Sequence, residues 1–286
     1  MKRGANGSGL ARAAAWRRVA LVALPALLAL GTMVAVLAGR PAWAQTAKEL
    51  NQAAHAHYQQ GQYAQAIDLL ERSVRMEPTA DSYYGLGMSY LKTGALDAAR
   101  KNFRSAVSLS PSYLSGLHTL AAAYMRGQGA PFDLDKAKDV LEDARAIDPD
   151  HRVTLSKLGE IYFIKSTIGV DTTHEAMARN GELAEKVLRR LLQLHPDDSQ
   201  AHMLLGQIHG NRGQFNSAIL EFQKAVKADA TNYNAWLYLG MDYYRIGLLK
   251  EAAQAFRMAG HSGSDSVRET SAKYLQRIEQ QQAQQP

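Results

Sequence analysis

Apolar positions in the body of the chain recur at the spacing of helices. One stripe, at i, i+3, i+4 and i+7, consists of Trp236, Leu239, Gly240 and Tyr243. A second stripe follows at Ala252, Phe256 and Ala259. Such spacing places apolar side chains on one face of a helix. The two stripes therefore predict a pair of neighbouring helices.

The same pattern occurs six times between residues 45 and 262. A small residue recurs at Ala54, Gly87, Ala121, Gly159, Gly206 and Gly240. An alanine follows each of them, at Ala66, Ala99, Ala137, Ala184, Ala218 and Ala252. The underlying period is 33 to 34 residues, and prolines close four of the units at Pro78, Pro111, Pro149 and Pro196, where they stop the second helix. We expect six helix pairs.

The repeated small residues are expected where the two helices of a pair come closest. A large side chain there would force the helix axes apart. Aromatic residues should fill the remaining space. His57 and His209 stand where other pairs have tyrosine, so we interpret them as packing residues rather than metal ligands.

Two pairs have a longer gap between their helices. The third gains four residues around Gly127–Asp133, and the fourth gains thirteen across Ser166–Ala178. In the fourth, Thr172 and Glu175 have the spacing of a capping box. We therefore expect the second helix of this pair to begin early and to run to Leu194.

These residues carry a family resemblance. The segment from Ala80 to Pro111 resembles the tetratricopeptide repeat throughout, and the longer third pair resembles the related Sel1-like repeat. The resemblance implies an all-α fold, a right-handed superhelical solenoid of six helix pairs plus a C-terminal capping helix. Such a solenoid has a concave groove lined mainly by the first helix of each pair.

The implied organisation has four parts. Residues 1–44 form a leader or anchor, residues 45–262 the repeats, residues 263–281 the capping helix, and residues 282–286 a disordered tail. The six repeats span about 47–79, 80–113, 114–151, 152–198, 199–232 and 233–262. One apolar stripe of the capping helix consists of Val267, Ser271, Tyr274, Leu275 and Ile278.

The resemblance also assigns the residues that face the groove. In the first three pairs they are Asn51, His55, Tyr58, Tyr84, Met88, Leu91, His118, Met125 and Arg126. In the last three they are Glu160, Phe163, Met203, Gln207, Asn211, Leu237, Met241, Tyr244 and Arg245. This lining is rich in methionine and tyrosine. Because methionine adapts to varied shapes, the surface suits apolar or helical segments of a protein partner.

The first 44 residues are typical of an export signal. Six basic residues and no acidic one precede residue 45, and an uncharged, mostly apolar run lies between Arg18 and Arg40. The order basic, apolar and Ala42-Trp43-Ala44 indicates a secretory leader cleaved before Gln45. Because about 20 apolar residues can also span a bilayer, the alternative is an uncleaved anchor that attaches the protein to the inner membrane through residues 19–39. Both the cleaved leader and the uncleaved anchor would place the body of the protein on the periplasmic side of a bacterial inner membrane.

Charge and composition narrow the classes of partner. The whole chain carries +6, but residues 45–286 hold 27 basic and 27 acidic residues, so the body has no excess charge for nucleic acid. With 46% hydrophobic residues the body is globular. The absence of cysteine excludes disulfides, thiol catalysis and zinc–thiolate sites. No cofactor or metal is expected.

No catalytic motif appears in the sequence. The resemblance implies a non-enzymatic scaffold that binds a peptide or helical segment in its groove, as part of an envelope assembly or secretion system. One alternative is a structural repeat protein that assembles into a homo-oligomer. The other is an enzyme, whose site would have to be built from His118, Glu160 and His202.

Overall fold

The computed structural model describes residues 45–127, 132–167 and 173–284. These residues contain helices and turns but no β-strand. The chain divides into two compact units, Met1–Ser110 and Pro111–Pro286. The predicted leader, residues 1–44, lies outside the described residues.

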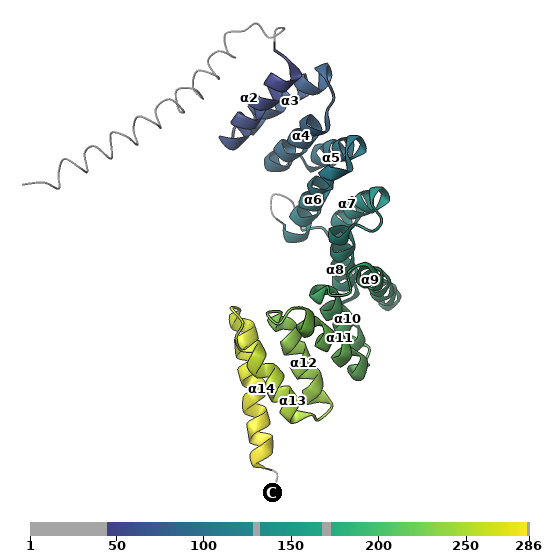
Figure 1. Cartoon of the computed structure of the whole chain (residues 1–286), viewed down its shortest axis with the longest axis vertical. Helices are drawn as coiled ribbons and strands as arrows, with labels where there is room; N and C mark the ends of the chain where they lie inside the picture. The colour runs from purple at the N-terminus through teal and green to yellow at the C-terminus, as the bar shows by residue number, and fades with distance from the viewer. Residues whose placement is uncertain (1–44, 128–131, 168–172, 285–286) are drawn as a thin grey trace, which may run out of the picture. The chain divides into compact units, whose positions relative to one another are not determined.

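The first unit contains two helix pairs (Figure 1). Its helices are α2 (Ala47–Gln59), α3 (Tyr63–Met76), α4 (Ala80–Thr93) and α5 (Leu96–Leu109). Consecutive helices pack against one another, and the first helices of the two pairs, α2 and α4, also touch. This contact between first helices creates the site described below.

The second unit contains four further pairs and a last helix. After a short 3₁₀ turn, η2 (Pro111–Tyr113), its helices are α6 (Leu114–Arg126), α7 (Leu134–Ile147), α8 (Arg152–Thr167), α9 (His174–Leu194), α10 (Ser199–Asn211), α11 (Phe215–Ala228), α12 (Tyr233–Arg245), α13 (Leu249–Ala259) and α14 (Asp265–Ala283). First helices again meet, α8 with α10 and α10 with α12. The expected all-α fold of six pairs plus a C-terminal helix is confirmed.

Local sequence signals set the ends of these helices. Thr46 forms a capping box with Glu49, and the side chain of Asp198 accepts a hydrogen bond from the backbone N–H of Ala201 at the start of α10. Glycines with positive φ follow the first helix of five pairs, at Gly61, Gly94, Gly127, Gly213 and Gly247. Because other residues rarely adopt this backbone conformation, these glycines allow the chain to turn at the end of the first helix.

Glycine also sets the distance between the helices of a pair. A Cβ atom at Gly87 would lie 2.5 Å from the ring of Phe103, and one at Gly206 would lie 2.6 Å from the ring of Phe222. Phe103 is completely buried. The expectation that small residues mark the closest approach is therefore met in these pairs.

The fourth pair differs slightly from its prediction. Helix α9 begins at His174 and ends at Leu194, as expected for an early start. Its N-cap is Thr173, whose side chain accepts from the backbone N–H of Ala176, whereas the sequence suggested Thr172, which lies outside the described residues. Two adjacent threonines offer the same chemistry one residue apart, so the sequence could not choose between them.

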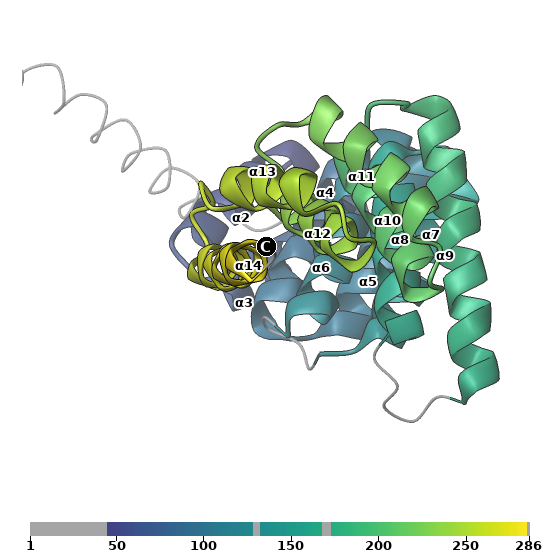
Figure 2. The same cartoon turned by 90° about the horizontal axis from the view of Figure 1, so that it is seen from below.

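The last helix covers the end of the repeats. In Figures 1 and 2, α14 lies beside α13. The ring of Tyr274 on α14 stacks on that of Phe256 on α13, with ring centroids 4.8 Å apart. Val267, Ser271 and Ile278 of the predicted stripe are buried. Helix α14 continues to Ala283, past the predicted start of a disordered tail at residue 282, because glutamine is a good helix former.

None of the helices in the described part of the chain is long and apolar enough to cross a membrane.

Candidate functional site

All eighteen residues assigned to the groove lie on first helices. Asn51, His55 and Tyr58 are on α2, and Tyr84, Met88 and Leu91 are on α4. In the second unit, α6 holds His118, Met125 and Arg126; α8 holds Glu160 and Phe163; α10 holds Met203, Gln207 and Asn211; and α12 holds Leu237, Met241, Tyr244 and Arg245. Whether these residues bind a ligand stays a prediction. Their exposure differs, however, and decides which of them can contact a ligand.

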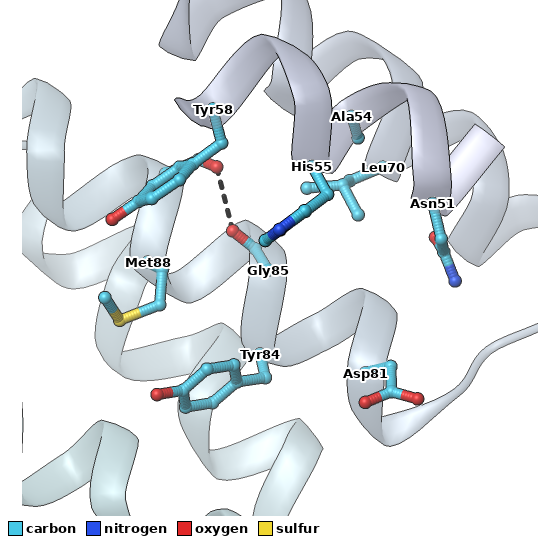
Figure 3. A pocket seen from close by; sticks show the side chains of 10 residues that line it. Asn51, Ala54, His55, Tyr58, Leu70, Asp81, Tyr84, Gly85 and Met88 are labelled. Carbon is cyan, nitrogen blue, oxygen red and sulfur yellow. Dashed lines mark hydrogen bonds between the residues drawn. The ribbon is translucent and has the colours of Figure 1, made fainter. Parts of the chain in front are cut away.

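Five of the eighteen residues line one cleft in the first unit. The cleft has a volume of about 320 Å³ and lies between α2 and α4 (Figure 3). The predicted residues in its lining are Asn51, His55, Tyr58, Tyr84 and Met88. Leu91, the sixth prediction in this unit, does not line it. A volume of this size is at the lower end of the range for ligand pockets.

Two tyrosine rings form walls of the cleft and are held from behind by other rings. Tyr58 packs edge-on against Tyr63 with centroids 5.3 Å apart, and Tyr84 packs against Phe103 at 5.7 Å. Burial, followed by the neighbouring Tyr63 and Tyr84, raises the pKa of Tyr58. The Tyr58 side chain is therefore an uncharged phenol at neutral pH.

Two polar side chains of the cleft, Asn51 and Ser89, are bonded within the protein. Asn51 donates from Nδ2 to Oγ of the buried Ser82 at 2.9 Å. Ser89 donates to the backbone carbonyl of Gly85 at 2.8 Å (Figure 3). These bonds hold Asn51 and Ser89 in place, so the cleft offers a ligand mainly its apolar and aromatic surfaces.

Sequence reasoning missed five residues of the cleft. They are Ala54, Leu70, Asp81, Gly85 and Ser89. Leu70 comes from the second helix α3, and it reaches the cleft because Gly85 of α4 has no side chain in front of it. A rule that considers only first helices cannot find such a residue.

Three predicted groove residues are buried. His118 is 8% exposed, Met203 7% and Leu237 9%. Met203 packs in a cluster with Phe222, and Leu237 packs in a cluster with Phe256. His118 accepts or donates a hydrogen bond at 2.8 Å with Thr154 of the next pair. Because packing between helices encloses these side chains, they offer little surface to a peptide.

The other predicted residues of the second unit remain partly or fully exposed. They are Met125, Arg126, Glu160, Phe163, Gln207, Asn211, Met241, Tyr244 and Arg245. Tyr244 contacts the last helix, since its ring lies 5.3 Å from that of Tyr274 and its hydroxyl accepts from Gln281 at 2.9 Å. This contact links a predicted groove position to α14.

A buried carboxylate next to these residues was not predicted. Asp242 of α12 is 2% exposed, and Arg245 donates to it at 2.8 Å. Burial raises the pKa of Asp242, although the Arg245 guanidinium acts in the opposite direction. The guanidinium of Arg245 also lies over the ring of Phe215 at 5.4 Å. Arg245 therefore supports the helix end rather than standing free for an anion.

Two of the three residues of the hypothetical enzyme site, His118 and His202, have other hydrogen-bond partners. His118 pairs with Thr154, whereas His202 lies 2.6 Å from Glu221 and 2.8 Å from the carbonyl of Pro196. Burial lowers the pKa of His118 to about 4. Burial by itself would lower the pKa of His202, because it disfavours the charged imidazole. The hydrogen bonds to Glu221 and to the carbonyl of Pro196 outweigh this effect, so the pKa of His202 is raised.

His57 and His209 lie near the ends of α2 and α10, where His57 is partly buried and His209 is buried. His57 Nδ1 lies 2.5 Å from the side-chain oxygen of Gln62, and His209 Nδ1 lies 2.8 Å from that of Gln214. Each glutamine belongs to the turn that follows the helix. Within the described residues, no group of three or more His, Cys, Asp or Glu side chains is placed to hold a metal ion.

Comparison with protein families gives one match over more than half of the chain. Residues 51–113, 177–230 and 209–266 match the family described as "Tetratricopeptide repeat". The chain belongs to the tetratricopeptide repeat family. Tetratricopeptide repeat proteins are generally protein-interaction scaffolds and are typically not catalysts.

Related sequences are longer proteins. The chain is 26% identical over 206 residues to anaphase-promoting complex subunit 3 of Schizosaccharomyces pombe, covering 71% of this chain and 28% of the relative. It is 26% identical over 233 residues to superkiller protein 3 of the same organism, covering 69% of this chain and 17% of that protein. The chain thus spans less than a third of the length of these two relatives.

A solved structure shares the fold. The C-terminal part of a TPR repeat-containing protein from Cytophaga hutchinsonii superposes with a TM-score of 0.62 at 12% identity, over 85% of this chain and 93% of that chain. At this identity the likeness shows the tetratricopeptide repeat fold alone.

Proposed function

We propose that this protein is an exported, non-enzymatic scaffold that binds a peptide or helical segment of a partner protein along its first helices. The observation that carries the proposal is the cleft between α2 and α4, which is lined by five residues expected in a groove. Asn51 and Ser89 of its lining are bonded within the protein, and Tyr58, Tyr84, Leu70 and Met88 give it aromatic and apolar surface. Such surfaces gain binding energy by removing apolar side chains from water.

The proposed location is the periplasmic side of a bacterial inner membrane. The support is the basic, apolar and Ala-Trp-Ala order of residues 1–44. We further propose that the partner belongs to an envelope assembly or secretion system, and that the long third pair is a Sel1-like unit. Mass spectrometry of the mature N-terminus tests export: a chain beginning at Gln45 supports a cleaved leader. An intact N-terminus on a protein found in the cytosol would contradict the location.

Binding in the cleft is tested by placing a charge in its wall. Met88 lines the cleft and is half-buried, so Met88→Glu should weaken capture of the partner from envelope extracts at least tenfold, because an apolar ligand would desolvate the carboxylate. Leu220→Glu is the matched control, since Leu220 is 58% exposed on the second helix α11. Equal losses in both variants, or no loss in either, would contradict the proposed function.

A further inference from the structure

The last helix, α14, has the register of a first helix. Its Tyr274 stacks on Phe256 of the preceding second helix, with ring centroids 4.8 Å apart. In the same way Tyr238 of α12 stacks on Phe222 of α11, with ring centroids 5.8 Å apart. Because Tyr238 stands two residues before the repeated glycine of α12, the alignment places Gln276 at the equivalent position of α14. Within the described residues no second helix follows α14.

A large side chain that every other first helix carries is missing from α14. Four residues before the repeated small residue, the six first helices have Leu50, Tyr83, Leu117, Leu155, His202 and Trp236. Trp236 packs against apolar clusters that contain residues of both α11 and α13. The equivalent residue of α14 is Ala272, and it is exposed. The space beside α14 that such a side chain would occupy is therefore left without one.

A groove lies at this place between α13 and α14. It consists of two adjoining clefts of about 460 Å³ and 250 Å³, which share Arg257 and Leu275. Ala272 lines the larger cleft. Leu275 is partly exposed, whereas Leu239, its equivalent in α12, is 3% exposed. The groove thus has apolar surface that the second helix covers in the preceding pair.

The charged residues that line the groove are mostly basic. They are Lys250, Arg257 and Arg268, with one carboxylate, Glu279. Arg268 already pairs with Asp265. Lys250 and Arg257 are exposed and have no hydrogen bond or ion pair with another described residue. Because they stand seven residues apart, they lie on one face of α13, where an acidic segment would meet both.

We propose that the groove between α13 and α14 binds an acidic helical segment of a partner protein, in the place of a second helix. The segment directs a large apolar side chain toward Ala272 and carboxylates toward Lys250 and Arg257. A helix of about 12 residues is about 18 Å long, which matches the 11 residues of α13. The inference goes beyond the proposed function, because the groove belongs to the second unit and uses none of the residues of the cleft between α2 and α4.

The direct test compares three fluorescent helical peptides of about 12 residues on the purified chain, by fluorescence anisotropy. The acidic probe carries leucines and one tryptophan along one stripe and glutamates elsewhere. The basic probe has lysine in place of each glutamate, and the scrambled probe has the acidic composition without the stripe. We expect the acidic probe to bind about three- to thirtyfold more tightly than either of the others. Added salt should reduce its advantage over the basic probe.

Reversal of the two available charges locates the binding. Lys250→Glu together with Arg257→Glu should weaken binding of the acidic probe about tenfold and strengthen binding of the basic probe. Arg179→Glu together with Lys186→Glu is the matched control, because these residues are also exposed, seven residues apart on one helix, α9, and without a partner among the described residues. The two double variants have the same net charge, so a general effect of charge would appear equally in both.

A second variant tests the apolar part of the groove. Ala272→Trp supplies the side chain that α12 has at Trp236, and should weaken binding of the acidic probe about fivefold or more, because it fills the larger cleft. Gln280→Trp is the control, since Gln280 is exposed on the same helix but lines neither cleft. Circular dichroism checks that the variants fold. If one does not, the preference of the unmodified chain among the three probes still decides the matter.

The outcomes separate this inference from the proposed function. Equal binding of the three probes, no binding of the acidic probe, or equal losses in the two double variants would overturn the inference. Self-association of the unmodified chain that the acidic probe abolishes would assign the groove to a second copy and overturn it as well. Met88→Glu, in the other cleft, should leave probe binding unchanged. A failure of the capture test at Met88 would therefore contradict the proposed function and leave this groove in place.

Discussion

At the scale of single residues, glycine and phenylalanine share the contact between the two helices of three pairs. Gly87 faces Phe103, Gly206 faces Phe222, and Gly240 faces Phe256, and an added Cβ would come within 2.5–2.8 Å of each ring. The three phenylalanine side chains are buried. Well-packed interiors leave no room for an extra methyl group, so these contacts fix how close the helices lie.

Gly87→Ala should therefore destabilise the first unit. The methyl group would collide with the ring of Phe103, and overpacking costs about 1–3 kcal/mol, from which alanine recovers at most about 1 kcal/mol by its higher helix propensity. A lower urea midpoint checks the prediction. Gly263→Ala is the control, because nothing lies within 4 Å of a Cβ at that position. A Gly87→Ala chain as stable as the control would show that the helices can separate freely.

A second residue contact joins consecutive pairs. The hydroxyl of Tyr90 on α4 donates to Glu71 on α3 at 2.6 Å, and Tyr162 on α8 donates to Glu142 on α7 at 3.1 Å. In the last pair Tyr243 stands at the equivalent position, and its hydroxyl accepts a hydrogen bond from Gln223 at 2.7 Å. In each case the partner lies five residues after the repeated alanine. The contact thus recurs with the repeat.

Tyr90→Phe should cost about 1 kcal/mol, because it removes a hydrogen bond to a carboxylate and keeps the ring. The bond to Glu71, followed by burial, raises the pKa of Tyr90 from 10.0 to about 12. Because the folded pKa is the higher one, this stabilisation is complete below pH 10 and declines as the pH rises toward 12. Urea unfolding at pH 8 and pH 11 measures both effects. A variant with the same stability and the same alkaline profile as the unmodified chain would refute this assignment.

At the scale of helices, a buried histidine makes the contact between α6 and α8 sensitive to acid. His118 bonds Thr154, and the ring of His151 lies 4.8 Å away. Burial, followed by the charges of His151 and Lys157, lowers the pKa of His118 from 6.5 to about 4. The folded state therefore takes up this proton less readily than the unfolded state does.

The second unit should lose stability as the pH falls from 6.5 to 4. His118 accounts for at most about 3 kcal/mol of this loss in the free energy of unfolding, since one pKa unit corresponds to about 1.4 kcal/mol. Thermal unfolding of the unmodified chain and of His118→Leu between pH 7 and pH 4 provides the measurement. The variant should show a smaller decrease in melting temperature across this range. Parallel decreases in the two proteins would rule out His118 as the cause.

The last helix, α14, protects the apolar end of the sixth pair. Ile278 is 2% exposed and belongs to the cluster around Phe256. Ile278→Asp should undock this helix, because a buried carboxylate without a partner is costly. We expect the unmodified chain to scatter light as a monomer, and the variant to melt at least several degrees lower and to associate. An unmodified chain that already forms a homo-oligomer would favour the alternative of self-assembly.

At the scale of the whole molecule, the sequence predicted what depends on the repeat and missed what depends on packing between repeats. The six pairs follow from small residues at a fixed period, and the early start of α9 follows from its threonines. By contrast, the burial of Met203 and Leu237 depends on how tightly neighbouring helices meet. The same is true of Leu70, which belongs to the cleft because it packs directly against Gly85 of the next pair.

The central claim is that the cleft between α2 and α4 receives a segment of a partner protein. Photo-crosslinking in living cells tests this claim most directly, with a photoreactive amino acid at Met88 in the cleft and, as the control, at Leu220 on α11. The account predicts that Met88 crosslinks to one defined peptide segment, located by mass spectrometry, and that Leu220 does not. Crosslinks to the same proteins from both positions, or none from Met88, would contradict it.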